Sequence, residues 1–367
     1  MTIQTPDVPV KSLLGNYLRF RNGRTSPERL DDEGYPVFGS NGPIGRSPRT
    51  NADGPLVVIG RVGSYCGSLF YSHDAAWVTD NAIICTAASP TETRYWYYAL
   101  QTLSLNNRSG GSGQPLLNQS VLASVEFQPA APSKRIAIGG VLGALDDKIA
   151  ANTRLIEAAD ELSRVVFTRM LNDTTNRPLS DVADFVNGKA FTKDASGTGR
   201  VVIRIAELNA GLGGSTVYND IDVPDQHLAR PGDLLFAWSG SLALHRWFRA
   251  EGIINQHIFK VLPKDGYPTW CVSALLVRKL DEFKAIAADK ATTMGHIQRR
   301  HLDEPVQVPV AAQIERNDTL MTSLWQRALA AEEESLGLVA IRDALLPRLM
   351  SGKIRVADAE QMVGDVV

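Results

Sequence analysis

Residue types that read nucleic acid occur in two separate sets of short segments bounded by glycine and proline. Arginine can bridge guanine and asparagine can bridge adenine in the major groove, whereas lysine, serine and backbone N–H groups hold phosphates. The first set is Arg24, Asn41, Arg46, Arg49, Arg61, Ser64, Tyr65 and Arg108. The second set is Lys189, Trp238, Ser239, Ser241, His245, Arg246, Arg249, Arg299 and Arg300. Each residue alone could equally be a solubilising surface charge or a half-buried aromatic, so the two sets are a hypothesis of DNA binding.

Catalytic chemistry has no comparable signal in the sequence. A phosphate-binding loop, a dinucleotide fingerprint, an HExxH zinc motif and a nucleophile elbow are all absent. The six histidines are scattered and have no metal-ligand spacing relative to the three cysteines. We therefore expect no catalytic residue and no metal site in this chain, and a binding or scaffolding function.

Composition narrows how this chain could bind DNA. The 367 residues carry 38 basic and 40 acidic side chains, a net charge of −2, which argues against binding through a general excess of positive charge. Contact would have to come from locally basic stretches at residues 46–49, 245–249 and 296–301. Three cysteines cannot form a disulfide framework, and no run of 18 apolar residues occurs, so we expect a cytoplasmic protein.

An internal repeat supplies the elements that would position these residues. Asn22-Gly23-Arg24 recurs as Asn187-Gly188-Lys189, and the apolar run before Gly63-Ser64 recurs before Gly240-Ser241. Residues 77–84 match residues 253–259, and a proline precedes a helical segment at both Pro129 and Pro309. These four blocks keep the same order at offsets of roughly 165 to 180 residues, which indicates a duplication.

Each half is predicted to be a globular unit of short strands followed by a long helix. Apolar residues in both helical segments recur at alternating steps of four and three, the spacing of a coiled-coil seam. In the distal helix this spacing begins at Leu320, and in the central helix Asn152 and Ser163 interrupt it, as register-fixing polar residues do. We predict the seam to be Leu142, Leu145, Ile149, Ile156, Val166, Leu324, Leu338, Ile341 and Leu345.

The predicted fold class is α+β, with two mixed α/β domains related by a pseudo-twofold duplication and separated by two long antiparallel coiled-coil helices. We expect the first domain at residues 1–130 and the central helix at residues 131–175. The second domain is expected at residues 176–308, the distal helix at 309–351 and a C-terminal tail at 352–367. This plan predicts that the paired helices hold the domains at opposite ends of a rod.

The sequence resembles the specificity (S) subunits of type I restriction–modification systems. The blocks that carry the resemblance are residues 35–45 (YPVFGSNGPIG), 54–64 (GPLVVIGRVGS), 78–82 (VTDNA), 231–241 (PGDLLFAWSGS), 255–257 (NQH) and 347–354 (PRLMSGKI). The resemblance implies that the domains are target-recognition domains, each reading one half of an asymmetric bipartite DNA site. It further implies that the helices set the spacing between the half-sites and dock methyltransferase subunits.

The resemblance also implies that this chain is a non-catalytic subunit of a phage-defence complex in the cytoplasm of a bacterium or archaeon. Its partners would be double-stranded DNA, two DNA methyltransferase (modification) subunits and, where the system has them, two restriction subunits. The chain itself would bind no cofactor: S-adenosylmethionine would belong to the modification subunit, and ATP and Mg to the restriction subunit. Two alternatives stay open, a coiled-coil adaptor whose domains bind proteins, and a stand-alone nucleic-acid enzyme.

Overall fold

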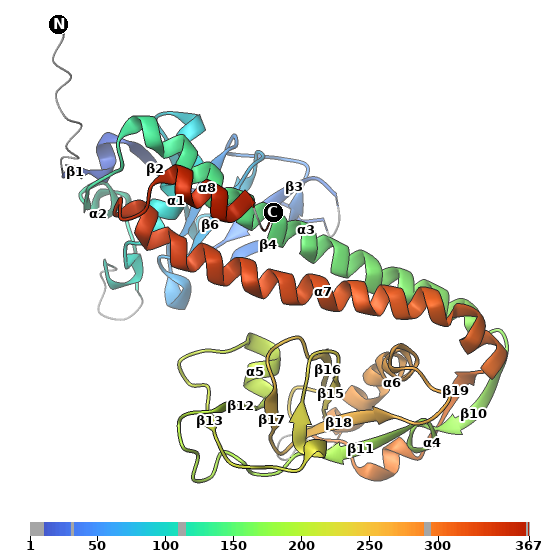
Figure 1. The fold of residues 1–367 in the computed structure, drawn as a ribbon. Coiled ribbons are helices and arrows are strands. Elements are labelled where there is room, and N and C mark those ends of the chain that lie inside the picture. Colours follow the sequence, from blue (N-terminus) through green and yellow to red (C-terminus); the bar gives the residue numbers. More distant parts are fainter. Residues whose placement is uncertain (1–10, 31–32, 109–114, 290–294, 365, 367) are drawn as a thin grey trace, which may run out of the picture. The chain divides into compact units, whose positions relative to one another are not determined.

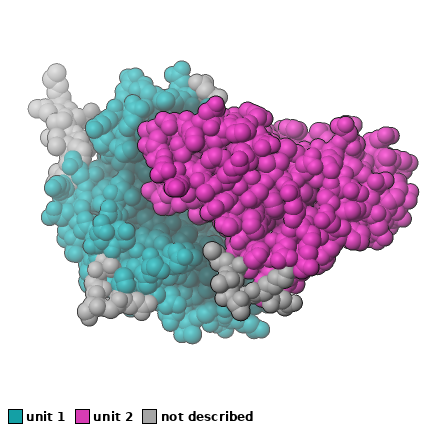
Figure 2. Space-filling model, turned by 90° about the horizontal axis from the view of Figure 1, so that it is seen from below, with its two compact units in different colours: residues 1–149, 337–367 teal, residues 150–336 magenta. Residues whose placement is uncertain are grey.

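The computed structural model describes residues 11–30, 33–108, 115–289, 295–364 and 366. Contacts divide the chain into two compact units, which are coloured separately in Figure 2. Unit 1 comprises residues 1–149 and 337–367, and unit 2 comprises residues 150–336. Each unit contains part of both long helices. The boundaries that the sequence suggests between domains and helices therefore stay a prediction.

Unit 1 is built around a four-stranded antiparallel sheet. Its strand order is β2 (Leu18–Asn22), β8 (Ala82–Ala87), β5 (Leu56–Gly60) and β6 (Leu69–Ser72). A second sheet pairs β4 (Gly42–Ser47) with β3 (Tyr35–Gly39), which runs parallel to β7 (Trp77–Val78). Every residue of β5 is buried, because its β-branched and leucine side chains fill both faces of a central strand.

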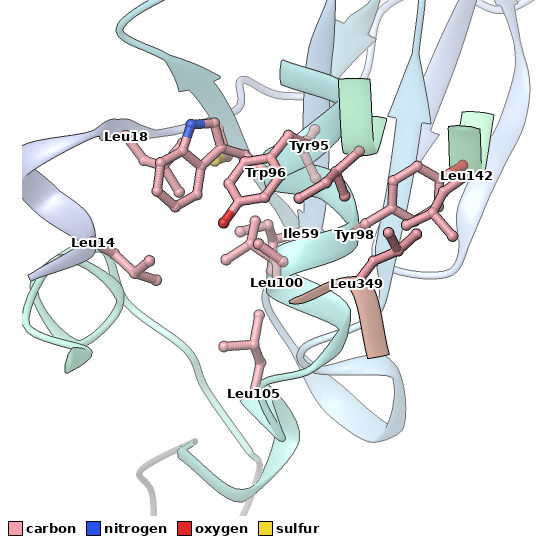
Figure 3. Close-up of a cluster of buried hydrophobic side chains, with 14 of the residues drawn as sticks. Leu14, Leu18, Ile59, Tyr95, Trp96, Tyr98, Leu100, Leu105, Leu142 and Leu349 are labelled. Carbon is pink, nitrogen blue, oxygen red and sulfur yellow. The ribbon is translucent and has the colours of Figure 1, made fainter. Parts of the chain in front are cut away.

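Helices complete the core of unit 1. The aromatic residues of α1 (Thr93–Gln101) pack between the sheet and the long helices, where Tyr95, Trp96 and Tyr98 are almost completely buried. Figure 3 shows Tyr98 beside Leu142 and Leu349 of the long helices, and Trp96 near Leu18 of β2. The smaller elements are α2 (Gln119–Ala123) and the paired strands β1 (Ser12–Leu13) and β9 (Glu126–Phe127).

Unit 2 has the same main sheet. Its order is β11 (Ala183–Asn187), β18 (Ile258–Pro263), β15 (Leu234–Ala237) and β16 (Ala243–Arg246), again antiparallel throughout. The second sheet has the order β13 (Tyr218–Asn219), β12 (Arg200–Ile203), β17 (Gly252–Ile254) and β14 (Leu228–Ala229). Strands β12 and β17 are parallel, as β3 and β7 are in unit 1. The other elements are α4 (Leu179–Val182), α5 (Ile205–Ala210), α6 (Thr269–Asp289), β10 (Thr174–Pro178) and β19 (Pro305–Pro309).

Two long helices run through both units, α3 (Pro132–Met170) and α7 (Ala311–Met350), and a short helix α8 (Val356–Gly364) follows (Figure 1). They are antiparallel neighbours. In unit 1, Leu142 and Leu145 share a buried cluster with Leu338 and Leu345. In unit 2, Asn152 is hydrogen-bonded to α7. The predicted α+β fold, with two mixed domains and two long helices, is confirmed.

The predicted seam residues differ in burial. Leu142, Leu145, Leu338 and Leu345 are at most 2% exposed. The remaining five are partly buried: Ile149, Ile156, Val166, Leu324 and Ile341. The extension of the seam to Leu320 is wrong, because that side chain is 45% exposed and Met321 is buried in its place. Residues on neighbouring positions lie about 100° apart on a helix, so one step moves a side chain from the seam to solvent. None of the described helices is long and apolar enough to span a membrane.

Candidate nucleic-acid interface

The two units repeat one backbone arrangement at the Asn-Gly-basic segment. The N–H of Gly23 donates to the carbonyl of Ala82 at 3.1 Å, and the N–H of Gly188 donates to the carbonyl of Ile258 at 2.9 Å. The next residues, Arg24 and Lys189, each bridge in parallel to the partner strand segment, at Thr79 and Asn255. Arg24 and Lys189 therefore occupy equivalent, exposed positions.

The glycines at this segment are required by a close approach of two backbones. A Cβ atom built on Gly23 would lie 2.0 Å from the carbonyl oxygen of Thr79, and one built on Gly188 would lie 2.1 Å from that of Asn255. Any side chain there would clash with main chain that cannot move independently of the sheet. The sequence motif thus marks the point where the backbone just after β2 or β11 approaches the backbone just after β7 or β17.

A second repeated element is the turn that follows the central strand of each main sheet. The N–H of Arg61 donates to Asn81 O at 2.9 Å, and the N–H of Trp238 donates to His257 O at 3.1 Å. The carbonyl groups of Arg61 and Trp238 accept from Leu117 and Ile297, respectively.

The glycines of these two turns also match. Gly63 donates to Pro115 O at 3.1 Å and Gly240 donates to Gly295 O at 2.9 Å. Both glycines have positive φ, 72° and 67°, a conformation that glycine adopts without strain. The turns are therefore equivalent, and each places an exposed serine, Ser64 or Ser241, directly after the glycine.

Different side chains stand on this shared backbone. In unit 1 the Arg61 guanidinium donates through Nη1 to Asp80 O at 3.1 Å, and its buried Nε has no hydrogen-bond partner among the described residues. Tyr65 lies two residues after Gly63 and is 49% exposed. Unit 1 thus presents hydrogen-bond donors and a phenol at the turn.

Unit 2 presents aromatic rings at the same place. Trp238 donates through Nε1 to the side chain of Asn187 at 2.8 Å and stacks on Phe259 at a centroid distance of 5.6 Å. Two imidazoles border the indole, His257 at 5.2 Å and His296 at 6.3 Å. His257 has φ of +73°, and its buried Nδ1 has no hydrogen-bond partner among the described residues.

The structure adds Asn81, His257, Leu116 and His296 to the candidate site, none of which the sequence patterns had selected. Asn81 and His257 lie opposite the turn in their units, and Leu116 and His296 bridge to the residue before each turn glycine. The signal for Asn81 and His257 was present in the repeat, because they align within its third block. Leu116 and His296 lie outside the four repeat blocks.

The other predicted residues of unit 1 surround the second sheet and the loops. Asn41 lies exposed in the tight turn between β3 and β4. Arg46 donates to Gly34 O at 2.7 Å, and Arg49 lies 5.0 Å above the Trp77 ring, so both side chains are partly engaged within the unit. Arg108 lines an open cavity of about 650 Å³ together with Lys11 and Glu126.

In unit 2 several predicted residues are engaged in the fold. Ser239 is only 7% exposed, so its side chain is poorly placed for a DNA contact. His245 is largely shielded, and burial lowers its pKa, which favours a neutral ring. Arg249 packs over Phe248 at 5.1 Å, and Arg299 donates to Phe185 O at 2.7 Å. Arg299 and Arg300 are both exposed.

Arg246 is the main correction to the sequence prediction. Its side chain is 7% exposed and forms a two-pronged ion pair with Glu332 of α7, at 2.8 and 3.1 Å. Asp160 of α3 lies 3.6 Å away, and the Trp325 ring lies 4.6 Å from the guanidinium. These groups leave the guanidinium little surface facing solvent, so Arg246 is a structural contact between the sheet and the helices.

Nothing in the described ranges resembles a metal centre, since no group of three or more His, Cys, Asp or Glu side chains there could hold an ion. The cysteines are buried, and burial raises the pKa of Cys271 to about 12 and that of Cys85 further. The thiols of Cys85 and Cys271 are therefore poor nucleophiles at neutral pH.

Comparison with known proteins confirms the resemblance seen in the sequence. No family model matches the chain. The EcoprrI type I restriction enzyme specificity subunit of Escherichia coli is 26% identical over 140 residues, which are 38% of this chain and only a third (33%) of that relative. The MjaIX type I specificity subunit of Methanocaldococcus jannaschii is 21% identical over 307 residues, covering 73% of this chain and 70% of that protein.

The fold has a solved counterpart. The crystal structure of a type I restriction–modification S subunit from M. genitalium matches with a TM-score of 0.64, covering 95% of this chain and 98% of that one. The two sequences are 14% identical, so this match establishes the fold alone.

Proposed function

We propose that this chain is the DNA sequence-specificity subunit of a type I restriction–modification complex, and that each unit reads one half of an asymmetric bipartite target. The observation that carries the proposal is the repeated turn with unlike side chains. A duplicated DNA-reading module must keep the backbone that presents its contacts, while each copy is free to change the bases it selects. Equivalent backbone with Arg61 in one unit and Trp238 in the other fits that requirement.

The chemistry of the two turns predicts different readout in the two halves. An arginine can form two parallel hydrogen bonds to O6 and N7 of guanine, and a good pair of this kind contributes about 1–3 kcal/mol of discrimination. Trp238 and its neighbouring imidazoles instead offer apolar contact to a thymine methyl group and a few polar atoms. Arg24 and Lys189, at equivalent exposed positions, suit phosphate contacts that orient each unit without selecting bases.

Charge indicates how much of the binding energy this chain supplies. A net charge of −2 and scattered exposed arginines predict few phosphate contacts, and the number of such contacts sets the salt dependence of affinity. We therefore assign much of the nonspecific affinity to modification subunits docked on α3 and α7. Adenine methylation with S-adenosylmethionine, and ATP- and Mg-dependent cleavage where a restriction subunit exists, belong to those partners in the cytoplasm.

The test is methylation by the chain co-expressed with its cognate modification subunit, read by methylome sequencing. We expect one split, asymmetric motif. Arg61→Ala should relax one base pair in one half-site by about 5- to 150-fold, the equivalent of 1–3 kcal/mol, and Trp238→Ala should affect only the other half-site. Arg200→Ala is the matched control, because Arg200 pairs with Glu251 inside unit 2 and is not a proposed contact.

Several outcomes would reject the proposal. Equal loss at both half-sites after Arg61→Ala would contradict modular reading. Absence of any methylated motif with a competent partner would contradict the specificity role. A protein-binding adaptor predicts that the reconstituted complex has no salt-dependent affinity for DNA. A stand-alone enzyme predicts turnover by this chain without an added subunit.

A further inference from the structure

The edge strands of the two main sheets place two different residues at one equivalent position. In unit 1, Tyr71 of β6 pairs with Val57, and in unit 2, Arg246 of β16 pairs with Leu234. Val57 and Leu234 are themselves equivalent. Each lies three residues before the last residue of its strand, and that last residue pairs with Ala82 in unit 1 and with Ile258 in unit 2. Ala82 and Ile258 are equivalent because their carbonyl groups accept the hydrogen bonds from Gly23 and Gly188. Tyr71 and Arg246 therefore mark the same point of the fold.

Both residues belong to a trio of arginine, aromatic ring and carboxylate that joins the sheet to a long helix. In unit 2 the edge strand contributes the arginine, and α7 contributes the ring of Trp325 and the carboxylate of Glu332. Asp160 of α3 adds a second carboxylate at 3.6 Å. The guanidinium thus touches both helices of the pair.

In unit 1 the same three chemical groups come from other elements. The edge strand contributes the ring of Tyr71, α1 contributes Arg94, whose guanidinium lies 5.4 Å from that ring, and α3 contributes Asp147. Arg94 donates to both oxygens of Asp147, at 2.8 and 2.6 Å, and to Gly143 O at 3.0 Å. A Cβ atom on Gly143 would lie 2.3 Å from Arg94 Nε, so the glycine leaves room for the arginine.

These trios fix the angle between sheet and helix, which the apolar core does not. Leucine, phenylalanine and methionine contacts between sheet and helix are non-directional and permit small rotations at little cost. A planar guanidinium that bonds two carboxylate oxygens and stacks on a ring is satisfied in one orientation only. The two units have diverged, yet each forms this trio, from residues at different positions. This argues that the connection between sheet and helix has been retained, and not one ancestral side chain.

We propose that the Arg246–Trp325–Glu332 and Tyr71–Arg94–Asp147 trios are orientation clamps. Each clamp holds the main sheet of its unit at a defined angle to the long-helix segments of that unit, and the two clamps thereby set the permitted spacing between half-sites. The proposal rests on the proposed function. Arg246 and Arg94 act in it as positioning residues and touch no DNA. Loss of a clamp should leave the bases selected unchanged and weaken discrimination between spacer lengths.

The first test needs no DNA. Spin labels are placed at exposed Ala206 of α5 and exposed Glu333 of α7, both in unit 2, and the distance distribution between them is measured in the full chain. Arg246→Ala should broaden this distribution, and the charge exchange Arg246→Glu with Glu332→Arg should narrow it again. Arg200→Ala, which breaks an ion pair confined to the sheet side of unit 2, should leave it unchanged. An unchanged distribution in Arg246→Ala would overturn the clamp.

The second test measures methylation of DNA substrates whose half-sites are fixed and whose spacer is shortened or lengthened by one base pair. Arg246→Ala should reduce the preference for the native spacer at least about fivefold while base preference stays as in wild type. Arg246→Lys, which keeps the charge but loses the fork, should show the same trend and covers the case in which the alanine variant folds poorly. A spacer profile like that of Arg200→Ala, or an altered base preference, would refute the clamp. Failure of wild type to methylate any split site would instead refute the proposed function.

Discussion

Asn152 is the polar residue at the centre of the helix pair, and its removal has a calculable effect. The side chain is 4% exposed, and its Nδ2 group lies 2.7 Å from Glu334 Oε2, 3.2 Å from Ser335 Oγ and 3.4 Å from Ala331 O. An amide has two N–H donors, so two of these three acceptors are served at once. The Glu334 and Ser335 bonds are the shorter pair and carry most of the energy.

The magnitude follows from the kind of acceptor. A hydrogen bond to a charged group contributes about 1.5–3 kcal/mol and one between neutral groups about 0.5–1.5 kcal/mol. Glu334 is exposed, so water replaces the lost bond and the lower end of the first range applies. Ser335 keeps its own bond to Ala331 O at 2.7 Å. Asn152→Ala should therefore destabilise unit 2 by about 2 kcal/mol.

A double-mutant cycle with Glu334→Ala isolates the pair. Unfolding free energies from denaturant titration, checked by hydrogen exchange at residues of α7 in unit 2, should give a coupling energy of about 1 kcal/mol. Asn152→Leu should destabilise unit 2 less than Asn152→Ala, because leucine fills the space in the seam. Neither former partner is left buried without a hydrogen bond, since Glu334 is exposed to water and Ser335 bonds to Ala331 O. A coupling below about 0.3 kcal/mol, which is within the additivity error for independent sites, would refute this account of the seam.

Two further predictions concern the close backbone approach at Gly23 and the clamp of unit 1. Gly23→Ala should destabilise unit 1 by more than about 3 kcal/mol in thermal or denaturant unfolding, because its Cβ would lie 2.0 Å from Thr79 O. Gly140→Ala is the control: its Cβ would meet no other atom, so the change should be neutral or stabilising by up to about 1 kcal/mol. A mild effect of Gly23→Ala would show that the two backbones can move apart. Arg94 holds the pKa of Asp147 in the folded protein below its ordinary value. The stability that Arg94 adds is therefore fully present above the unfolded-state pKa of about 3.9. This stability is lost as the pH falls through the lower pKa of the folded state. The stability difference between wild type and Arg94→Ala should accordingly shrink below about pH 4, and a difference that grows on acidification would contradict this sign.

Sequence patterns located the repeated blocks because their causes are local. A glycine that two backbones approach closely, as at Gly23 and Gly188, must be conserved between copies whatever the side chains around it do. Helix periodicity is local in the same way, and it indicated the two long helices α3 and α7. The seam prediction was wrong at Leu320, where two adjacent apolar residues, Leu320 and Met321, could each have been assigned to the seam.

At the candidate site, by contrast, the sequence did not predict which side chains are exposed. Ser239, Arg246 and Ser241 are all polar residues near glycine in one short stretch, and nothing in that stretch distinguishes their fates. Only Ser241 is exposed, whereas Ser239 is buried and Arg246 is ion-paired to a helix 86 residues later in the chain.

The sequence by itself thus determined the duplication, the two long helices and the glycine-marked turns, since each depends on neighbouring residues. The tertiary structure alone decided which side chains face solvent, because burial and ion pairing depend on packing between distant segments. It matched Arg61 with Trp238 as equivalent positions on the two turns, and it placed Arg246 in an ion pair with Glu332 of α7.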